Sequence, residues 1–335
     1  MNNILVTGGF GFLGSHLVEL LLAEQENHVH VLDNLSTSPL PLDNLLDELG
    51  HPKNLTYSIT DIEAFCKSPP GEGYDEIYHL ASVVGPAGVL PHAGRITASI
   101  ISDTMALANL ALNCNAGLVD VSTSEVYGGG REGFCSETMV KIVQADASPR
   151  LEYAVGKLAT EIALVNLYKT RGLDVKIVRP FNITGPRQSG KGGFVLPRFI
   201  GQAVANADIT VFGDGRQIRT FTHVKDMAAG IVCAMKNGKA GEVYNLGNPK
   251  NRCSIRELAD EVKTITRSAS RIVFVDPKTI YGPLYEEANN KFPDASKALR
   301  ELAWIPRYER TAIIEETFRY MKGLPEPLLF RLRGF

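Results

Sequence analysis

A glycine-rich turn near the N-terminus constrains the fold more than any other part of the sequence. The segment "TGGFGFLG" (7–14) directly follows the apolar run "NILV" and leads into a stretch whose apolar residues recur every three or four positions. Gly8, Gly11 and Gly14 permit a tight turn, the close approach of a pyrophosphate to the backbone, and close packing of a helix on the strand. Because the turn lies between a strand and a helix, it predicts a dinucleotide site rather than an ordinary turn.

An acidic residue follows at the position that such a site needs. Asp33 ends the apolar run "HVHVLD" and could accept hydrogen bonds from an adenosine ribose. A carboxylate there would repel a 2′-phosphate, so NAD is favoured over NADP. Asp61 and Ile62, after the third run, could reach the adenine, although Asp61 could equally cap a helix.

Short β-branched runs alternate with helical patterns over the first 180 residues. The runs lie at 3–8, 28–33, 55–61, 76–81, 117–123 and 174–181. Strands that are apolar on both faces need cover on both sides. The alternation therefore predicts an α/β fold with a Rossmann-type, doubly wound parallel sheet.

The chain beyond residue 181 predicts a smaller mixed α/β lobe with one return to the sheet. A glycine-rich loop precedes an amphipathic stretch at 195–204, and "SIRELADEVKTI" opens with a capping box of Ser254 and Glu257. Residues 223–247 have the pattern of a sheet-packing helix, ended by Gly238, and a further strand. We expect 1–181 plus about 223–247 to form the dinucleotide-binding domain, and about 182–222 and 248–335 to form the second lobe.

Charge and cysteine usage exclude several classes of protein. The chain has 335 residues, with 35 basic and 37 acidic residues, a formal net charge of −2 and no block of like charges, so we expect no nucleic-acid or membrane partner. Its five cysteines are scattered and odd in number, which favours reduced thiols. No signal-peptide pattern opens the chain, and the sequence indicates no metal site. A cytoplasmic protein is expected.

A tyrosine and a lysine four residues apart predict the reacting group. In "EYAVGK", Tyr153 and Lys157 share one face of a helix. An ammonium beside the phenol, together with a positive nicotinamide ring, would lower the pKa of the tyrosine. Tyr153 could then remove a proton from a sugar or alcohol hydroxyl while hydride leaves for the cofactor.

Polar side chains end the fifth predicted strand, in "STSEVYG". In a parallel sheet, ligands gather outside the carboxyl ends of the strands, where Thr123, Ser124 and Glu125 would lie. Thr123 could hydrogen-bond the hydroxyl that Tyr153 deprotonates, and Glu125 could place a carboxylate beside the neighbouring ring carbons. The alternative is a polar strand cap with Glu125 in water.

Seven motifs in order resemble the extended short-chain dehydrogenase/reductase superfamily, which includes NAD-dependent nucleotide-sugar epimerases, dehydratases and decarboxylases. They are "TGGFGFLGSH", "LDNLS", "HLAS", "STSEVYG", "YAVGK", "RPFNITGP" and "VFGDGRQIRTFTHVKD", within about residues 3 to 305. The resemblance implies an enzyme with bound NAD, a nucleotide-sugar substrate, and Thr123, Glu125, Tyr153 and Lys157 as the catalytic set. The implied NAD contacts are Gly8, Phe10, Gly11, Phe12, Leu13, Asp33, Asn34, Ser36, Asp61, Ile62, Leu80, Ala81, Ser82, Ser122, Tyr153, Lys157 and Pro180. The implied substrate contacts are Ser124, Asn182, Arg187, Val195, Phe212, Arg219 and Lys291, with Arg219 offering a fork to phosphate and Phe212 a face to a uracil-like ring.

The strand-end motif separates the members of this superfamily. Simple 4-epimerases resemble the chain but usually have a small residue where Glu125 stands, and thymidine-linked glucose dehydratases have an aspartate at Ser124. "STSEVYG" is most similar to UDP-glucuronate decarboxylases, which act through a 4-keto sugar. GDP-mannose dehydratases also have Ser-Glu, so 4,6-dehydration or epimerisation is the alternative. Lys291 stands where the decarboxylases usually have an arginine, and it lacks the bidentate fork.

Two further expectations depend on the resemblance. It implies a homodimer formed through the two long helices that contain Leu107 and Leu158, whose apolar stripes could also be core. A catalytically silent NAD-sensing regulator on the same fold is a remote alternative, which the presence of Thr123, Tyr153 and Lys157 disfavours.

Overall fold

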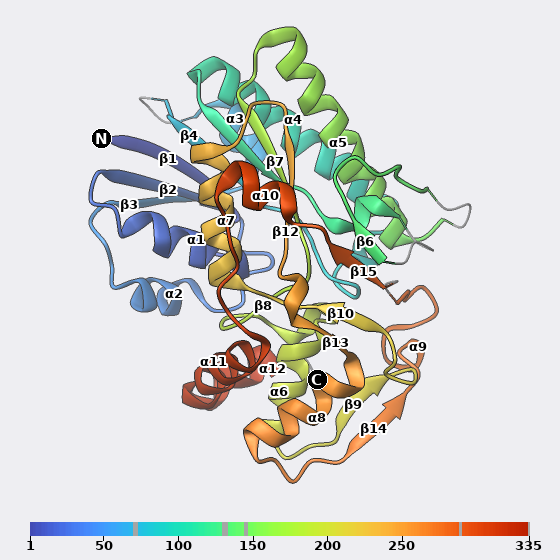
Figure 1. Ribbon diagram of the computed structural model, residues 1–335. Coiled ribbons are helices and arrows are strands. Elements are labelled where there is room, and N and C mark those ends of the chain that lie inside the picture. Colours follow the sequence, from blue (N-terminus) through green and yellow to red (C-terminus); the bar gives the residue numbers. More distant parts are fainter. Residues whose placement is uncertain (70–72, 129–132, 144–146, 288–289, 334–335) are drawn as a thin grey trace.

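The centre of the molecule is a seven-stranded parallel sheet. The computed structural model describes residues 1–69, 73–128, 133–143, 147–287 and 290–333. The strand order is β12–β7–β5–β4–β1–β2–β3 (Figure 1), which confirms the predicted doubly wound α/β fold. The strands are β1 (Asn2–Thr7), β2 (Asn27–Asp33), β3 (Leu55–Ile59), β4 (Glu76–His79), β5 (Gly117–Val121), β7 (Val175–Pro180) and β12 (Val243–Leu246).

Alternate residues of these strands enter two apolar cores, one on each face of the sheet. On β1, Ile4 and Val6 pack into one core and Leu5 into the other. The first core is covered by α1 (Phe12–Leu22) and α7 (Val224–Asn237), and the second by α3 (Ile62–Lys67), α4 (Ile96–Cys114) and α5 (Pro149–Arg171). This cover on both faces explains why the strands have apolar runs rather than a polar–apolar alternation.

Local signals located several helices correctly. Helix α6 (Val195–Val204) has the predicted bounds, and α7 ends at Asn237, one residue before Gly238. Helix α8 (Ile255–Thr266) begins with both hydrogen bonds of the Ser254–Glu257 capping box. The strand predicted in "EVYNLG" is β12, which pairs with β7 at the edge of the sheet.

The remaining elements form mostly short pairs and helices. Figure 1 shows many of them gathered at one end of the sheet. The strand pairs are β8 (Ile183–Thr184) with β11 (Thr222–His223), β9 (Ile209–Phe212) with β14 (Ile272–Val275), and β10 (Ile218–Thr220) with β13 (Arg252–Ser254). The helices are α2 (Leu42–Leu49), α9 (Lys278–Tyr281), α10 (Ser296–Leu302), α11 (Arg310–Gly323) and α12 (Glu326–Arg333). The domain boundaries predicted above remain a prediction.

One small pair brings distant parts of the chain to the end of β5. Strand β6 (Gly133–Cys135), which follows "STSEVYG", pairs in parallel with β15 (Lys291–Pro293). Lys291 is therefore held close to a segment more than 150 residues earlier in the chain.

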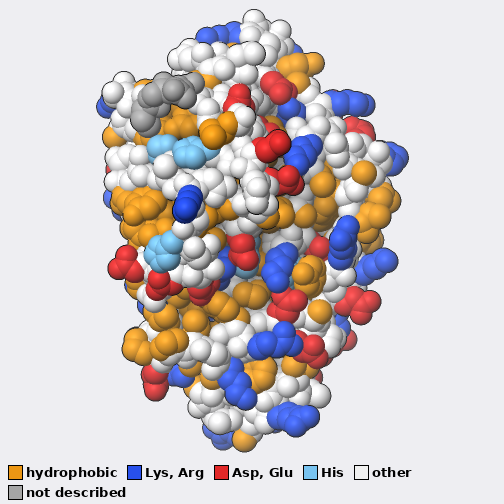
Figure 2. Space-filling model, turned by 90° about the vertical axis from the view of Figure 1, so that its left-hand side faces the viewer, with side chains coloured by type: hydrophobic (Ala, Val, Ile, Leu, Met, Phe, Trp, Pro, Cys, Tyr) orange, Lys and Arg blue, Asp and Glu red, His pale blue; other side chains and the backbone are white. Residues whose placement is uncertain are grey.

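The two helices predicted to form a dimer pack against each other. Leu107 of α4 is fully buried in the core beneath the sheet, so it cannot contact a partner, and Leu158 of α5 packs against the cluster around Tyr127. The apolar stripes are core there, and the homodimer stays a prediction. None of the described helices is long and apolar enough to cross a membrane. Figure 2 shows acidic and basic side chains interspersed with apolar ones over one face of the molecule.

Candidate functional site

The glycine turn forms a cradle at the carboxyl end of β1. Gly8 has φ +69°, and a Cβ on it would lie 2.8 Å from the backbone of Ala81, in the loop that follows β4. A Cβ on Gly14 would lie 2.0 Å from the carbonyl oxygen of Gly8. Gly11 is the N-cap of α1. Glycine is therefore required for the helix to start this close to the strand.

Asp33 holds the same turn from the end of β2. Its Oδ2 accepts a hydrogen bond from the backbone N–H of Phe10 at 2.9 Å, and its Oδ1 accepts one from Leu35 at 2.7 Å. Burial raises the pKa of Asp33, whereas these two bonds lower it. Phe10 itself is fully buried against Tyr57, so only its backbone lies at the predicted NAD site.

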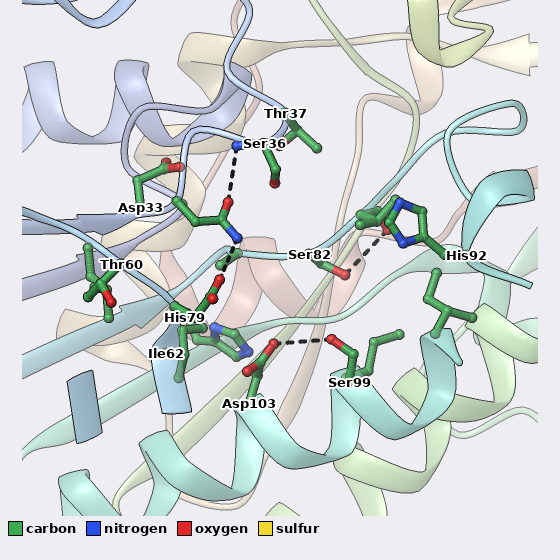
Figure 3. Close-up of a pocket in the computed structure, with 18 of the residues that line it drawn as sticks. Asp33, Ser36, Thr37, Thr60, Ile62, His79, Ser82, His92, Ser99 and Asp103 are labelled. Carbon is green, nitrogen blue, oxygen red and sulfur yellow. Dashed lines mark hydrogen bonds between the residues drawn. The ribbon is translucent and has the colours of Figure 1, made fainter. Parts of the chain in front are cut away.

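A cavity of about 360 Å³ opens between these loops and α4 (Figure 3). Asn34 donates to Asp61 at 2.8 Å and accepts from the backbone of Ser36 at 3.1 Å. Asp61 precedes α3 but makes no side-chain cap bond, so its carboxylate is available to the cavity rather than to the helix. The predicted NAD residues that line the cavity are Gly8, Asp33, Asn34, Ser36, Asp61, Ile62, Ala81, Ser82 and Lys157.

These residues fit a dinucleotide. The cavity lining includes Gly8 of the glycine turn, which leads into the N-terminus of α1, and two carboxylates beside a polar turn. The other predicted contacts are not among the residues that line this cavity: Phe10, Gly11, Phe12, Leu13, Leu80, Ser122, Tyr153 and Pro180. Ser122 is buried, and its hydroxyl donates to Glu161.

The Tyr153–Lys157 pair lies on α5 with its side chains under the end of β5. Lys157 Nζ donates to the carbonyl oxygen of Val121 at 2.9 Å. Helix α5 approaches α4 closely at Gly156, where a Cβ would lie 3.1 Å from Cα of Thr97. This close packing sets how deeply the pair reaches into the site.

The pKa of Tyr153 lies above its ordinary value in this structure, and its lowering by Lys157 together with a nicotinamide ring stays a prediction. Burial raises the pKa of Tyr153 well above its ordinary value, a hydrogen bond with Thr123 lowers it, and the carboxylates of Glu125 and Asp120 raise it. Tyr153 is only 7% exposed, and desolvation of the phenolate is the largest cause of the raised pKa.

Glu125 is held by two cations and is not a carboxylate in open water. Arg150 donates to Oε2 of Glu125 from Nε at 2.8 Å and from Nη2 at 2.7 Å, and Lys291 Nζ lies 3.2 Å from the same oxygen. Burial opposes the charge, but Arg150 and Lys291 hold the pKa of Glu125 at about 2. Lys291 also donates to the carbonyl oxygen of Ser124 at 3.3 Å. The carboxylate is ionised at neutral pH and lies beside two cations.

The arginines predicted for the nucleotide diphosphate are paired with carboxylates. Arg187 donates to Glu48 at 2.6 Å and to Glu19 at 2.9 Å, and Arg219 donates to Glu287 at 2.5 Å. A phosphate at either site would have to compete with these partners, and both contacts stay predictions.

The other predicted substrate contacts also have internal partners or limited exposure. The Phe212 ring, predicted to stack on a uracil-like ring, is buried and has the Arg198 guanidinium 3.8 Å from its centroid, so that face is not open. Asn182 donates to the carbonyl oxygen of Thr220 at 3.2 Å, and Val195 is the first residue of α6.

Sequence reasoning missed Arg150. It lies three residues before Tyr153 in "PRLEYAVGK", at a spacing that puts both on one face of α5. The spacing from Tyr153 could have indicated Arg150 as a site residue. The sequence does not indicate its partner, because Glu125 lies 25 residues away.

Comparisons with known proteins show the family of the chain. The family model for the NAD dependent epimerase/dehydratase family matches residues 4–247. The chain is 32% identical over 321 residues to the UDP-N-acetyl-alpha-D-glucosaminuronate decarboxylase of Bacillus cytotoxicus, covering 96% of this chain and 98% of that protein. It is 32% identical over 328 residues to UDP-glucuronic acid decarboxylase 6 of Arabidopsis thaliana, covering 96% and 90%. The crystal structure of UDP-glucuronic acid 4-epimerase from Bacillus cereus, in complex with UDP-glucuronic acid and NAD, has a TM-score of 0.80 at 27% identity, covering 95% of this chain and 98% of that one.

Proposed function

The chain belongs to the NAD dependent epimerase/dehydratase family, and from this premise we propose that it is an NAD-dependent decarboxylase of a UDP-linked uronic acid, UDP-glucuronate first. The observation that carries the proposal is the Glu125–Arg150–Lys291 cluster beside Tyr153. Two cations share one carboxylate there, which leaves one positive charge for an anionic sugar.

The cofactor is NAD, which accepts a hydride from the sugar and returns it in the same cycle when bound. The Gly8–Gly14 turn and the N-terminus of α1 would hold its pyrophosphate. Asp33 would hold its ribose, and Asn34 with Asp61 its adenine side. Of these residues, Gly8, Asp33, Asn34 and Asp61 line the cavity.

Tyr153 is the proposed base for the sugar hydroxyl at carbon 4. Thr123 would share that hydroxyl, because its side chain already hydrogen-bonds Tyr153. Lys157 would be held in place by its hydrogen bond to the carbonyl oxygen of Val121 and would present its ammonium to the site. Oxidation at carbon 4 gives a ketone β to the carboxylate, from which carbon dioxide leaves and a proton replaces it at carbon 5.

The Arg150–Lys291 pair is the proposed site for the carboxylate of the sugar. A guanidinium presents two parallel N–H groups to a carboxylate, and Arg150 already uses this fork on Glu125. Lys291 adds a point charge at the position where the resemblance expects an arginine. Because Glu125 is ionised, it does not serve as the proton donor in this arrangement.

Epimerisation at carbon 4 of the same substrate is the second candidate. The likeness to UDP-glucuronic acid 4-epimerase supports it, and both reactions begin with the same oxidation. A 4,6-dehydratase is less well supported, because Ser124 stands where an aspartate would be needed and its neighbour Glu125 is engaged by two cations.

One experiment separates these activities. The purified protein is incubated with UDP-glucuronate, UDP-N-acetylglucosaminuronate, UDP-glucose, GDP-mannose and thymidine-linked glucose, and products are followed by mass. A decarboxylase lowers the mass of a uronate by about 44 units and a dehydratase lowers that of a neutral sugar by about 18, by stoichiometry. An epimerase leaves the mass unchanged and alters retention. The proposal would be overturned if neither of the two uronates lost mass.

We also propose that the protein is a cytoplasmic homodimer. Light scattering of the purified chain tests the dimer, and a mass near 36.5 kDa would contradict it.

A further inference from the structure

Asp120 is a carboxylate in the core, beneath the reacting group. It lies on β5, three residues before Thr123, and is 0% exposed. Neither carboxylate oxygen has a hydrogen-bond partner among the described residues. A buried charge without a donor is strongly unfavourable unless opposite charge lies near. The place of Asp120 therefore needs an electrostatic explanation.

His79 of β4 faces Asp120 and is held in one orientation. Its Nδ1 lies 2.8 Å from the Thr7 hydroxyl, whose oxygen accepts from the backbone of Ala81 and whose hydrogen is available to Nδ1. The other ring nitrogen, Nε2, lies 3.3 Å from the Thr104 hydroxyl and 3.9 Å from Oδ1 of Asp120. Burial holds the pKa of His79 well below its ordinary value, so the ring is neutral and does not balance Asp120.

The positive charge that acts on Asp120 is the ammonium of Lys157. Its Nζ donates to the carbonyl oxygen of Val121, the residue next to Asp120, and the side chain is buried. Glu161 of α5 has the same sign of charge as Asp120. The Arg179 guanidinium of β7 is already paired with Glu161. Asp103 of α4 lines the cavity together with Lys157 and has the same sign of charge as Asp120. Lys157 is thus the available cation for Asp120.

We propose that Asp120 is a positioning residue of the catalytic pair: its carboxylate balances the Lys157 ammonium and thereby sets how basic the Tyr153 phenol is. The proposal rests on the proposed role of Tyr153 as the base. Asp120 acts through Lys157 and touches neither substrate nor cofactor.

The sign of the effect follows from the charges. An ionised Asp120 raises the pKa of Tyr153, and a neutral Asp120 leaves the Lys157 charge free to lower it. Burial raises the pKa of Asp120 itself to about 6, with Lys157 lowering it and Glu161 raising it. Above about pH 6 the carboxylate therefore opposes formation of the phenolate, and below about pH 6 this opposition is removed.

The first test needs no substrate. In protein labelled with ¹³C at the aspartate carboxyls, NMR titration identifies Asp120 as the resonance that is lost in Asp120→Asn. We expect it to titrate near pH 6 in the wild type. We expect its pKa to rise in Lys157→Met, because the balancing cation is gone. A resonance that is unmoved by Lys157→Met would overturn the proposal, whatever the protein's activity.

The second test is the pH profile of a single turnover. In Asp120→Asn the phenol is more acidic, so the rate at pH 7 should exceed that of the wild type by about three- to tenfold, since one pKa unit is tenfold in phenolate on the acid limb. Below about pH 6 the ratio should approach one, because Asp120 is then neutral in both proteins. A ratio that does not depend on pH would contradict the proposal.

Two variants separate the charge effect from a packing defect. Asp120→Leu removes the same charge without needing a hydrogen-bond partner, and it should reproduce the pH-dependent ratio if Asp120→Asn folds poorly. Thr104→Val disturbs the same buried cluster without changing charge. It should lower stability and leave the shape of the pH profile unchanged.

Discussion

Arg150 and Glu125 form a bidentate contact in which Nε and Nη2 of the arginine both donate to Oε2 of the glutamate, at 2.8 and 2.7 Å. The single acceptor leaves Oε1 of Glu125 outside this fork. Lys291 Nζ lies 3.2 Å from the same oxygen, Oε2. The two cations and Glu125 together carry one net positive charge, which is the basis of the carboxylate site proposed above.

Arg150→Met should weaken the handling of a uronate far more than that of a neutral sugar. Losing a half-buried, charge-assisted contact costs about 2–3 kcal/mol, or about 30- to 150-fold in kcat/KM for UDP-glucuronate. Binding of UDP-glucose, measured by calorimetry, should change less than threefold. Arg150→Lys keeps the charge and should recover part of the loss. Equal losses for both nucleotide sugars would contradict the carboxylate site.

Tyr153→Phe removes the proposed base and keeps the ring. We expect turnover to fall by about 10²–10⁴-fold, the range for loss of a general base. Binding of NAD should persist, because the turn around Gly8 and Asp33 is untouched. Fluorescence titration with NADH and product analysis by mass measure the two properties. Full activity of this variant would remove Tyr153 from the mechanism.

Local chemistry made most of the sheet and several helices predictable from the sequence. The capping box at Ser254 and the glycine after Asn237 fixed helix ends because they satisfy or terminate backbone hydrogen bonds locally. Arg150 and Lys291 meet Glu125 across 25 and 166 residues, through an α5 contact and the β6–β15 pair. Such long-range pairings leave no periodicity in the sequence. The raised pKa of Tyr153 was missed for a related reason, because burial depends on the packing of α5 against α4.

Gly14→Ala tests the cradle. Its Cβ would lie 2.0 Å from the carbonyl oxygen of Gly8, which cannot move without shifting the turn. We expect a loss of about 3 kcal/mol or more in the free energy of unfolding, with NAD binding lost as well. The matched control is Gly323→Ala in α11, where a Cβ meets no atom within 4 Å. The control should change the melting temperature by less than about 2 °C.

Glu161 and Arg179 should couple strongly, because both are buried. Arg179 Nε donates to Glu161 at 2.8 Å, and its Nη1 donates to the Tyr127 hydroxyl at 2.9 Å. Glu161→Gln leaves an uncompensated guanidinium and should cost about 3–5 kcal/mol in urea unfolding. The double variant Glu161→Met with Arg179→Met should lose less than the sum of the single changes. Additive losses would show that the pair is not the source of the stability.

His16 should make the folded protein sensitive to mild acid. Its Nε2 donates to the carbonyl oxygen of Pro186 at 3.0 Å, and burial, with Arg187 nearby, lowers the pKa of His16 to about 3. The folded state therefore excludes a proton that the unfolded state binds below its ordinary pKa of 6.5. The stability from a neutral His16 is fully present above pH 6.5 and falls by about 1.4 kcal/mol per pH unit as the pH drops toward 3.

The variant His16→Gln isolates this effect. A glutamine amide can still donate to Pro186 and does not titrate, so the free energy of unfolding should fall less steeply between pH 6.5 and 4.5 than in the wild type. The difference between the two proteins should reach about 2 kcal/mol at pH 5, because 1.5 units lie between that pH and 6.5. His51→Gln removes an exposed histidine, 64% accessible, and should keep the wild-type slope. Identical slopes for His16→Gln and the wild type would mean that His16 binds its proton in the folded state, and that the packing of α1 against Pro186 opens at mildly acidic pH.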